Sequence, residues 1–308
     1  MTTNAIQSSH IYSTYFAPRG RSRIYTLGMQ IAQLYLSPFD QIIGFIGEAG
    51  SGKSVLIKGM FPGIELTNDD DGVNVRPLPL LEQEYETGFF TPHTYHLDIR
   101  FETGFHQLSE LADAVRLAVR RGKRIIIEHF DLIYPLLGVN ANLLIGVGEQ
   151  IVITRPNLFG PLPQELCDIV YPSLAYRLMA HSAEDLCEYS MTQEQMLACS
   201  HGDIRHGFVL EFNEHQPDID IPTLEARVNE LIRQDLPIDY YDESHILLGG
   251  AQHYCTGPRT HVRSTVRIIG FRLLDHFIYD HFHKTYMLVG CVGDDSEENI
   301  RKLETIHG

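Results

Sequence analysis

The sequence predicts an α/β protein whose first half forms a parallel β-sheet with helices on both faces. Three observations carry this prediction. The apolar run Ile42–Ile46 enters a glycine-rich turn, after which residues 55–60 can form a helix. The β-branched run at residues 125–127 is typical of a strand that is buried on both faces. Between these runs, residues 108–121 place apolar side chains at helical spacing, so strands and helices alternate along the chain.

Further segments of this half are also expected to be regular. They are a helix at residues 25–36 and strands at residues 64–66, 94–101 and 149–154. Pro38 ends the first of these helices, and Gly122 ends the helix at residues 108–121. Residues 157–163, with one glycine and two prolines, form the expected linker. We therefore expect two domains, at residues 1–160 and 161–308.

Length, charge and cysteine content restrict the class of protein. A chain of 308 residues is long enough for two domains with cores of their own. Five cysteines without a tight spacing pattern favour the reducing cytoplasm, and no apolar run reaches the length of a membrane span, so we expect a cytoplasmic protein without a membrane partner. The net charge of −16 disfavours broad nonspecific binding to nucleic acid. The basic cluster at residues 116–124 is either a local exception or the solvated face of a helix.

The stretch after the first strand matches G-x-x-x-x-G-K-[ST], the pattern of a phosphate-binding loop between a strand and a helix. Glycines let backbone N–H groups approach phosphate oxygens, and the helix N-terminus adds partial positive charge. Lys53 can reach the β- and γ-phosphates, and the Ser54 hydroxyl can ligate Mg²⁺. We therefore expect a nucleoside triphosphate to bind with Mg²⁺, and we take it as ATP although the pattern does not separate ATP from GTP. The residues expected to bind it are Gly47, Glu48, Ala49, Gly50, Ser51, Gly52, Lys53 and Ser54.

Three carboxylates join Lys53 as candidates for catalysis beside this loop. Asp70 lies in an acidic turn after the short strand candidate, where it can serve Mg²⁺-bound water or a substrate hydroxyl, although aspartate is also an ordinary turn residue. Glu128 ends the β-branched run, at the position from which a carboxylate reaches the Mg²⁺ shell or polarises the attacking group. Asp131 is the second choice for this role.

This half resembles P-loop kinases of the uridine kinase and phosphoribulokinase kind. The features that carry the resemblance are the phosphate loop, the acidic stretch after the second strand and the element that ends at Glu128. The half is also similar to the small ATPase of threonylcarbamoyladenosine tRNA modification, through the loop and residues 96–98. These resemblances imply a P-loop NTPase fold and an enzyme that hydrolyses ATP or transfers its phosphate.

The second half carries side chains that suggest a metal site. His181 and Asp185 lie four residues apart on a predicted helix at residues 174–189, so they share one face, although most such pairs are surface residues. Cys255 and His261 lie in one turn-rich stretch, and a thiolate with an imidazole in a cytosolic protein suggests Zn²⁺. The other elements expected here are a strand ending at residue 212, a helix at residues 221–236, and strands at residues 266–274 and 286–292.

Over residues 174–292, the second half resembles the second additional domain of alanyl- and threonyl-tRNA synthetases, an α+β editing domain. The family's H-x-x-x-H helix and C-G-G-T-H-V motif carry the resemblance. It implies four zinc-ligand positions, which are His181, Asp185, Cys255 and His261. The second helix histidine of the family is an aspartate here, and the cysteine-to-histidine spacing is two residues longer. The resemblance also implies tRNA as a partner.

Three functions are consistent with this organisation. The favoured one is an ATP-binding P-loop NTPase or small-molecule kinase, joined to an editing-like domain that binds tRNA or a phosphoryl acceptor. The second is a metal-dependent hydrolase of mischarged aminoacyl-tRNA that is regulated by nucleotide. The third is a noncatalytic, nucleotide-switched binding module. Acceptor-dependent ADP formation, deacylation of mischarged tRNA, and nucleotide binding without either reaction would separate the three.

Overall fold

The computed structural model describes residues 12–67, 78–82, 93–213 and 215–307 of the chain. The described residues form two compact units. Unit 1 extends to Pro172 but leaves out Pro18–Gly20, and unit 2 consists of Pro18–Gly20 together with the residues from Ser173 onward. The division falls inside the long helix α7 (Pro163–Ser190), whereas the sequence analysis placed a boundary after residue 160.

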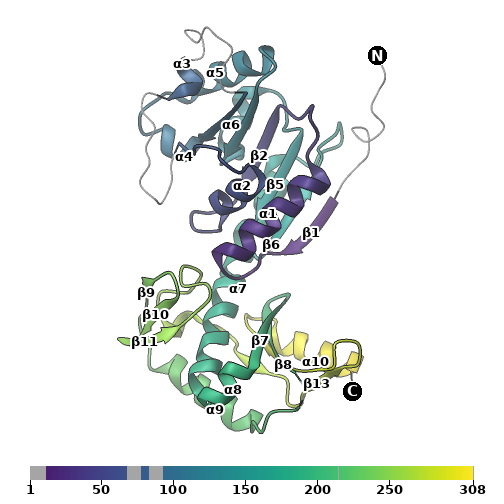
Figure 1. The fold of residues 1–308 in the computed structure, drawn as a ribbon, viewed down its shortest axis with the longest axis vertical. Helices are drawn as coiled ribbons and strands as arrows, with labels where there is room; N and C mark the ends of the chain where they lie inside the picture. Colours follow the sequence, from purple (N-terminus) through teal and green to yellow (C-terminus); the bar gives the residue numbers. More distant parts are fainter. Residues whose placement is uncertain (1–11, 68–77, 83–92, 214, 308) are drawn as a thin grey trace. The chain divides into compact units, whose positions relative to one another are not determined.

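Unit 1 is built on a mixed β-sheet (Figure 1). Its strands in spatial order are β1 (Tyr12–Phe16), β6 (Gln150–Thr154), β5 (Leu143–Val147), β2 (Ile42–Ile46), β4 (Arg124–Glu128) and β3 (Thr94–Asp98). The strands β5, β2, β4 and β3 run parallel, but β6 is antiparallel to both β5 and β1. The prediction of a parallel sheet is therefore wrong at this edge, because the two residues Gly148 and Glu149 join β5 to β6 and so short a connection permits only a hairpin.

Helices cover both faces of this sheet. The helices on one face are α1 (Arg21–Tyr35) and α2 (Lys53–Met60), and those on the other are α5 (Leu108–Arg120), α6 (Phe130–Leu137) and the first turns of α7. Strand β4 contributes to both cores, because successive side chains of a strand point to opposite faces. Ile125 and Ile127 pack on the α5 side, and Ile126 packs on the α1 side. The β-branched run is therefore buried on both faces, as predicted.

Two segments of unit 1 differ from the expectation. Residues 64–66 form an irregular loop and no strand. The strand that begins at Thr94 stops at Asp98, because the Asp98 carboxylate accepts the backbone N–H of Phe101 and so caps the short helix α4 (Ile99–Glu102). A further short helix, α3 (Pro79–Glu82), precedes β3.

Unit 2 packs helices against two antiparallel sheets. One sheet has the order β11 (Ala251–Tyr254), β10 (His245–Leu248) and β9 (Ile238–Asp242). The other has the order β12 (Arg272–Leu273), β14 (Thr285–Cys291), β8 (Gly207–Asn213) and β7 (Cys199–Ile204), with β13 (Ile278–Asp280) paired to β14. The helices are the second part of α7, α8 (Gln193–Ala198), α9 (Ile221–Arg233) and α10 (Ser296–His307).

The core of unit 2 joins Leu186 of α7, Leu210 of β8 and Val228 of α9. The strand predicted at residues 266–274 is wrong in most of its length, since a 3₁₀ turn (Thr265–Arg267) and the two-residue strand β12 occupy it. Among the described residues of both units, no helix combines the length and the apolarity that crossing a bilayer requires.

One side of α7 carries polar side chains into the interior of unit 2. His181, Glu184, Asp185 and Glu188 are each 6% exposed or less. They recur every three or four residues, so they form a single stripe on the helix. Buried charges of this density require partners, and the stripe therefore marks the place where unit 2 assembles a polar site.

Candidate functional site

The glycine-rich motif lies where β2 ends, at the carboxyl edge of the parallel strands. Three of its glycines adopt positive φ angles, 154° at Gly47, 80° at Gly50 and 96° at Gly52, which L side chains rarely adopt. A Cβ atom on Gly47 would also lie 2.5 Å from the carbonyl oxygen of Val147. Helix α2 begins at Lys53, and the N–H groups of its first turn have no partner within the helix. This backbone is compatible with phosphate binding.

The Lys53 ammonium group is folded back onto the loop. It is 4% exposed and donates to the carbonyl oxygens of Gly47 at 2.9 Å and Glu48 at 2.8 Å. Its Nζ also lies 3.8 Å from Oε2 of Glu128. Burial lowers the pKa of Lys53, although the Glu128 carboxylate opposes this shift. A phosphate group beside Nζ would add further negative charge next to this buried cation.

Glu128 ends β4 directly beside the loop. It lies opposite Phe45, the second-last residue of β2, because β2 and β4 are neighbouring parallel strands. Its Oε1 accepts the Ser54 hydroxyl at 3.1 Å and the His96 imidazole at 3.1 Å. Burial alone would raise the pKa of Glu128, but the hydrogen bond from His96 and the charge of Lys53 outweigh burial and lower it. The carboxylate is therefore ionised at neutral pH.

A hydrogen-bonded chain behind Glu128 fixes its orientation. The backbone N–H and the hydroxyl of Thr67 lie 3.1 Å and 3.2 Å from Nδ1 of His96. Since an N–H can only donate, Nδ1 is the acceptor, and the ring proton sits on Nε2, which donates to Glu128. The sequence analysis did not identify Thr67 or His96 as site residues. The available signal was that His96 and Asp98 lie two apart at the end of one strand, so they share a face beside Glu128.

The other predicted catalytic acids lie elsewhere. Asp70 falls outside the described residues. Asp131 is in the first turn of α6, where it accepts the Tyr171 hydroxyl at 3.3 Å, so Glu128 is the acid that contacts the loop. Arg155, which follows β6, forms a buried ion pair with Asp40 at 2.7 Å.

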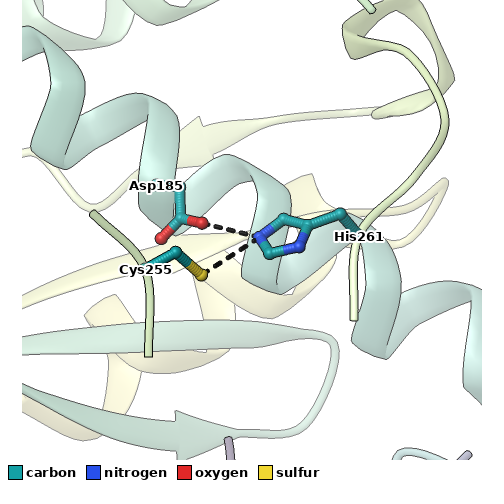
Figure 2. A group of neighbouring side chains, drawn as sticks. All are labelled: Asp185, Cys255 and His261. Carbon is teal, nitrogen blue, oxygen red and sulfur yellow. Dashed lines mark hydrogen bonds and ion pairs between the residues drawn. The ribbon is translucent and has the colours of Figure 1, made fainter. Parts of the chain in front are cut away.

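A second site gathers in unit 2, where Asp185 of α7 meets Cys255 and His261 from the stretch after β11 (Figure 2). The Nε2 atom of His261 lies 2.6 Å from Asp185 Oδ2 and 3.7 Å from the Cys255 sulfur. The Nδ1 atom of His261 lies 3.3 Å from the Pro258 carbonyl oxygen, to which it donates its proton. The lone pair of Nε2 then faces a carboxylate, so a second proton or a metal cation has to lie between the two acceptors.

His181 does not join this group. Its Nε2 lies 3.9 Å from Asp203, and its Nδ1 is buried without a hydrogen-bond partner among the described residues. Burial lowers the pKa of His181 to about 3, so its imidazole is neutral. Three of the four predicted zinc-ligand positions are therefore close together in the structure, and the fourth is not.

Arg19 supplies a buried positive charge that sequence reasoning did not anticipate. It is 2% exposed, forms ion pairs with Glu184 and Asp185, and donates to the Cys255 sulfur at 3.1 Å. Burial disfavours the charge of Asp185, but Arg19 and His261 hold the pKa of Asp185 well below its usual range. Burial dominates at the other two groups, where it raises the pKa of Glu184 to about 7 and that of Cys255 to about 12.

Comparison with known proteins identifies no family for this chain. No protein-family model matches the sequence, and no curated protein matches it. Among solved structures, a similar chain is an amino transferase from Eubacterium rectale, which is 12% identical. The match covers 75% of this chain and 65% of that chain, with a TM-score of 0.23. A score this low supports no conclusion about fold or activity.

Proposed function

We propose that unit 1 binds a nucleoside triphosphate with Mg²⁺ and either hydrolyses it or transfers its terminal phosphate to a small molecule. One observation carries the proposal: Glu128 lies 3.1 Å from the Ser54 hydroxyl and 3.8 Å from the Lys53 ammonium at a glycine-rich loop. A carboxylate, a hydroxyl and an ammonium group beside such a loop are the groups that Mg²⁺-dependent phosphoryl transfer uses. The resemblance of this half to P-loop kinases supports the same assignment.

Each group has a distinct role in this proposal. Backbone N–H groups of the loop hold the phosphates, and Lys53 exchanges the carbonyl oxygens of Gly47 and Glu48 for phosphate oxygens. Ser54 and Glu128 would hold Mg²⁺, which neutralises the charge that develops on the phosphates. His96 keeps Glu128 oriented and ionised through its Nε2 proton.

The test is nucleotide turnover by the full chain with Mg²⁺ and either ATP or GTP, with and without bulk tRNA. We expect Lys53→Ala to abolish turnover, and Lys58→Ala, a lysine change on the same helix outside the loop, to retain it. Lys53-dependent binding without turnover would instead indicate a noncatalytic module. The absence of both nucleotide binding and nucleotide turnover would overturn the proposal. Stimulation by tRNA would show that both halves serve one substrate, and a panel of small acceptors would follow if tRNA has no effect.

We also propose that unit 2 binds Zn²⁺ through Asp185, Cys255 and His261. The close approach of two acceptors, Asp185 Oδ2 and His261 Nε2, favours this second function, because a cation between them would satisfy both. The thiol of Cys255 would lose its proton on binding, and its hydrogen bond from Arg19 stabilises the resulting charge. Bound Zn²⁺ would supply an activated water for ester hydrolysis.

The resemblance to the editing domain of tRNA synthetases names the substrate to try first, which is mischarged aminoacyl-tRNA. We expect the purified chain to contain zinc by elemental analysis and Cys255→Ser to lose one equivalent of it. Deacylation of mischarged tRNA that disappears in this variant would support the hydrolase. Zinc binding without deacylation would indicate a structural zinc site and no hydrolase. Absence of zinc in the wild type would refute the zinc site itself.

A further inference from the structure

A second group of metal-ligating side chains lies beside the first in unit 2. It consists of Asp185, Glu188 and His253, whose ligand atoms all lie within 4.8 Å of one another. All three residues are buried. Asp185 belongs to both groups, so the two sets of ligands adjoin through one carboxylate.

The same two segments of the chain deliver both groups. Glu188 follows Asp185 by three residues on α7, so both carboxylates lie on the buried stripe of that helix. His253 lies on β11 and precedes Cys255 by two residues, so the two side chains point to the same side of the extended chain. Formation of the first group therefore brings the second one together as well.

His253 provides the observation that points to a ligand. It is 7% exposed, and its Nε2 is buried without a hydrogen-bond partner among the described residues. A neutral imidazole has one nitrogen lone pair with which it can bind a cation. An unsatisfied imidazole nitrogen next to two buried carboxylates is costly, and a bound cation would remove that cost.

The Glu188 carboxylate already accepts hydrogen bonds of the kind that hold metal-bound carboxylates in place. Its Oε1 accepts the His201 imidazole at 2.6 Å and the Cys199 thiol at 3.5 Å. Ligating carboxylates are commonly held by such hydrogen bonds. The hydrogen bonds of Arg19 within unit 2 go to Glu184, Asp185 and Cys255.

We propose that unit 2 binds a second divalent cation through Asp185, Glu188 and His253, with Asp185 shared between the two cations. Two carboxylates and one imidazole suit Mn²⁺ or Zn²⁺, whereas the first group contains a thiolate and favours Zn²⁺. Charge permits both cations. The ligands Asp185, Glu188 and the Cys255 thiolate contribute −3, and two dications contribute +4. Arg19 and its partner Glu184 offset each other, which leaves +1 in all.

The test titrates Co²⁺ and Zn²⁺ into the nucleotide-free, metal-stripped full chain and measures bound metal by equilibrium dialysis. We expect two equivalents in the wild type. His253→Gln should bind one equivalent and keep the sulfur-to-Co²⁺ charge-transfer absorption, and Cys255→Ser should bind one without that absorption. Asp185→Asn should bind neither cation tightly. His283→Gln, a histidine change at an exposed position, should behave as the wild type.

Other outcomes separate this proposal from the zinc site. A wild type that binds one equivalent, retained by His253→Gln and lost by Cys255→Ser, would overturn the second site and keep the first. A wild type that binds one equivalent, lost by His253→Gln and retained by Cys255→Ser, would support the second site and refute the first. No bound metal would refute both. If circular dichroism shows His253→Gln to be unfolded, Glu188→Gln replaces it, with the same expected loss of one equivalent.

Discussion

The glycine-rich loop of unit 1 and the buried polar cluster of unit 2 are assembled in opposite ways. The loop takes most of its groups from residues 47–54, and Glu128 and His96 reach it because β4 and β3 are the next strands of the same sheet. The cluster joins α7 to the stretch after β11 and to Arg19, which lies 236 residues from Cys255. A local motif therefore specifies the first site, and tertiary packing specifies the second.

The two sites also differ in what their charges do for stability. Glu128 and Lys53 are also buried, at 3% and 4% exposure, but each has uncharged hydrogen-bond partners besides the other, which are two loop carbonyls for Lys53 and the Ser54 and His96 side chains for Glu128. In unit 2, Arg19 and the acids that pair with it are each 2% exposed, so each charge depends on its partner for compensation. Substitutions in the loop should therefore affect function first, and substitutions in the cluster should affect folding first.

The largest expected effect is that of Arg19→Ala on the stability of unit 2. The substitution leaves buried carboxylates without a partner, which typically costs about 3–5 kcal/mol. Hydrogen exchange of the α7 and β8 amides in the presence of a chelator measures this change. Arg233→Ala is the matched control, because Arg233 pairs with Glu230 on the surface, at 66% and 56% exposure, and we expect less than about 1 kcal/mol there. Equal losses in both variants would contradict the contrast between the two regions.

The next largest effect concerns catalysis in unit 1. Glu128→Gln should lower nucleotide turnover by about 100-fold, because it removes the charge that contacts Ser54 and Lys53. Asp131→Asn should have little effect, since Asp131 contacts Tyr171 on α7. Steady-state kinetics of the two variants decide between these acids. A loss confined to Asp131→Asn would show that the catalytic assignment is wrong.

An effect of similar size follows from the pKa of Glu184, which burial raises from 4.5 to about 7. The folded state holds this proton more tightly than the unfolded state, so Glu184 makes stability fall as the pH rises from about 4.5 to about 7. The free energy of unfolding of Glu184→Gln should therefore rise relative to the wild type over this window, by about 3 kcal/mol at about 1.4 kcal/mol per pKa unit. Urea titrations at pH 4.5 and pH 7 measure the difference, and a constant offset between the two proteins would refute it.

The smallest predicted effect is that of His96→Gln, because His96 contacts Glu128 and has only a positioning role in the proposed site. We expect kcat to fall by about tenfold with little change in KM, the size of effect seen when a group that orients a metal-bound residue is removed. His276→Gln, at an exposed position of unit 2, is the control. A rise in KM with unchanged kcat would instead place His96 in ground-state binding.

Sequence reasoning reached the local features of unit 1 and missed the contacts between its elements. The loop and Glu128 were identifiable because glycine spacing and a β-branched run are local patterns. His96 and Thr67 were missed because their hydrogen bonds join a strand to an irregular loop. The antiparallel strand β6 had a local signal that was not used, namely the two-residue connection at residues 148–149.

In unit 2, spacing alone was a poorer guide. His181 and Asp185 share one stripe of α7, yet only Asp185 reaches Cys255 and His261, and His181 faces Asp203. The spacing of two residues on a helix gives a common face but not a common partner. Nothing local to residues 18–20 indicates that Arg19 belongs to a site whose other residues lie between positions 184 and 261.

The most direct test of the central claim is the equilibrium binding of Mg²⁺·ATP and Mg²⁺·GTP to the full chain, measured by titration calorimetry. We expect saturable binding of one or both nucleotides, weakened by about 10- to 100-fold in Lys53→Ala, since a charge-assisted hydrogen bond is lost. Lys58→Ala should bind as the wild type does. Absence of binding, or equal affinity in the wild type and Lys53→Ala, would contradict the assignment of residues 47–54 as a nucleotide site.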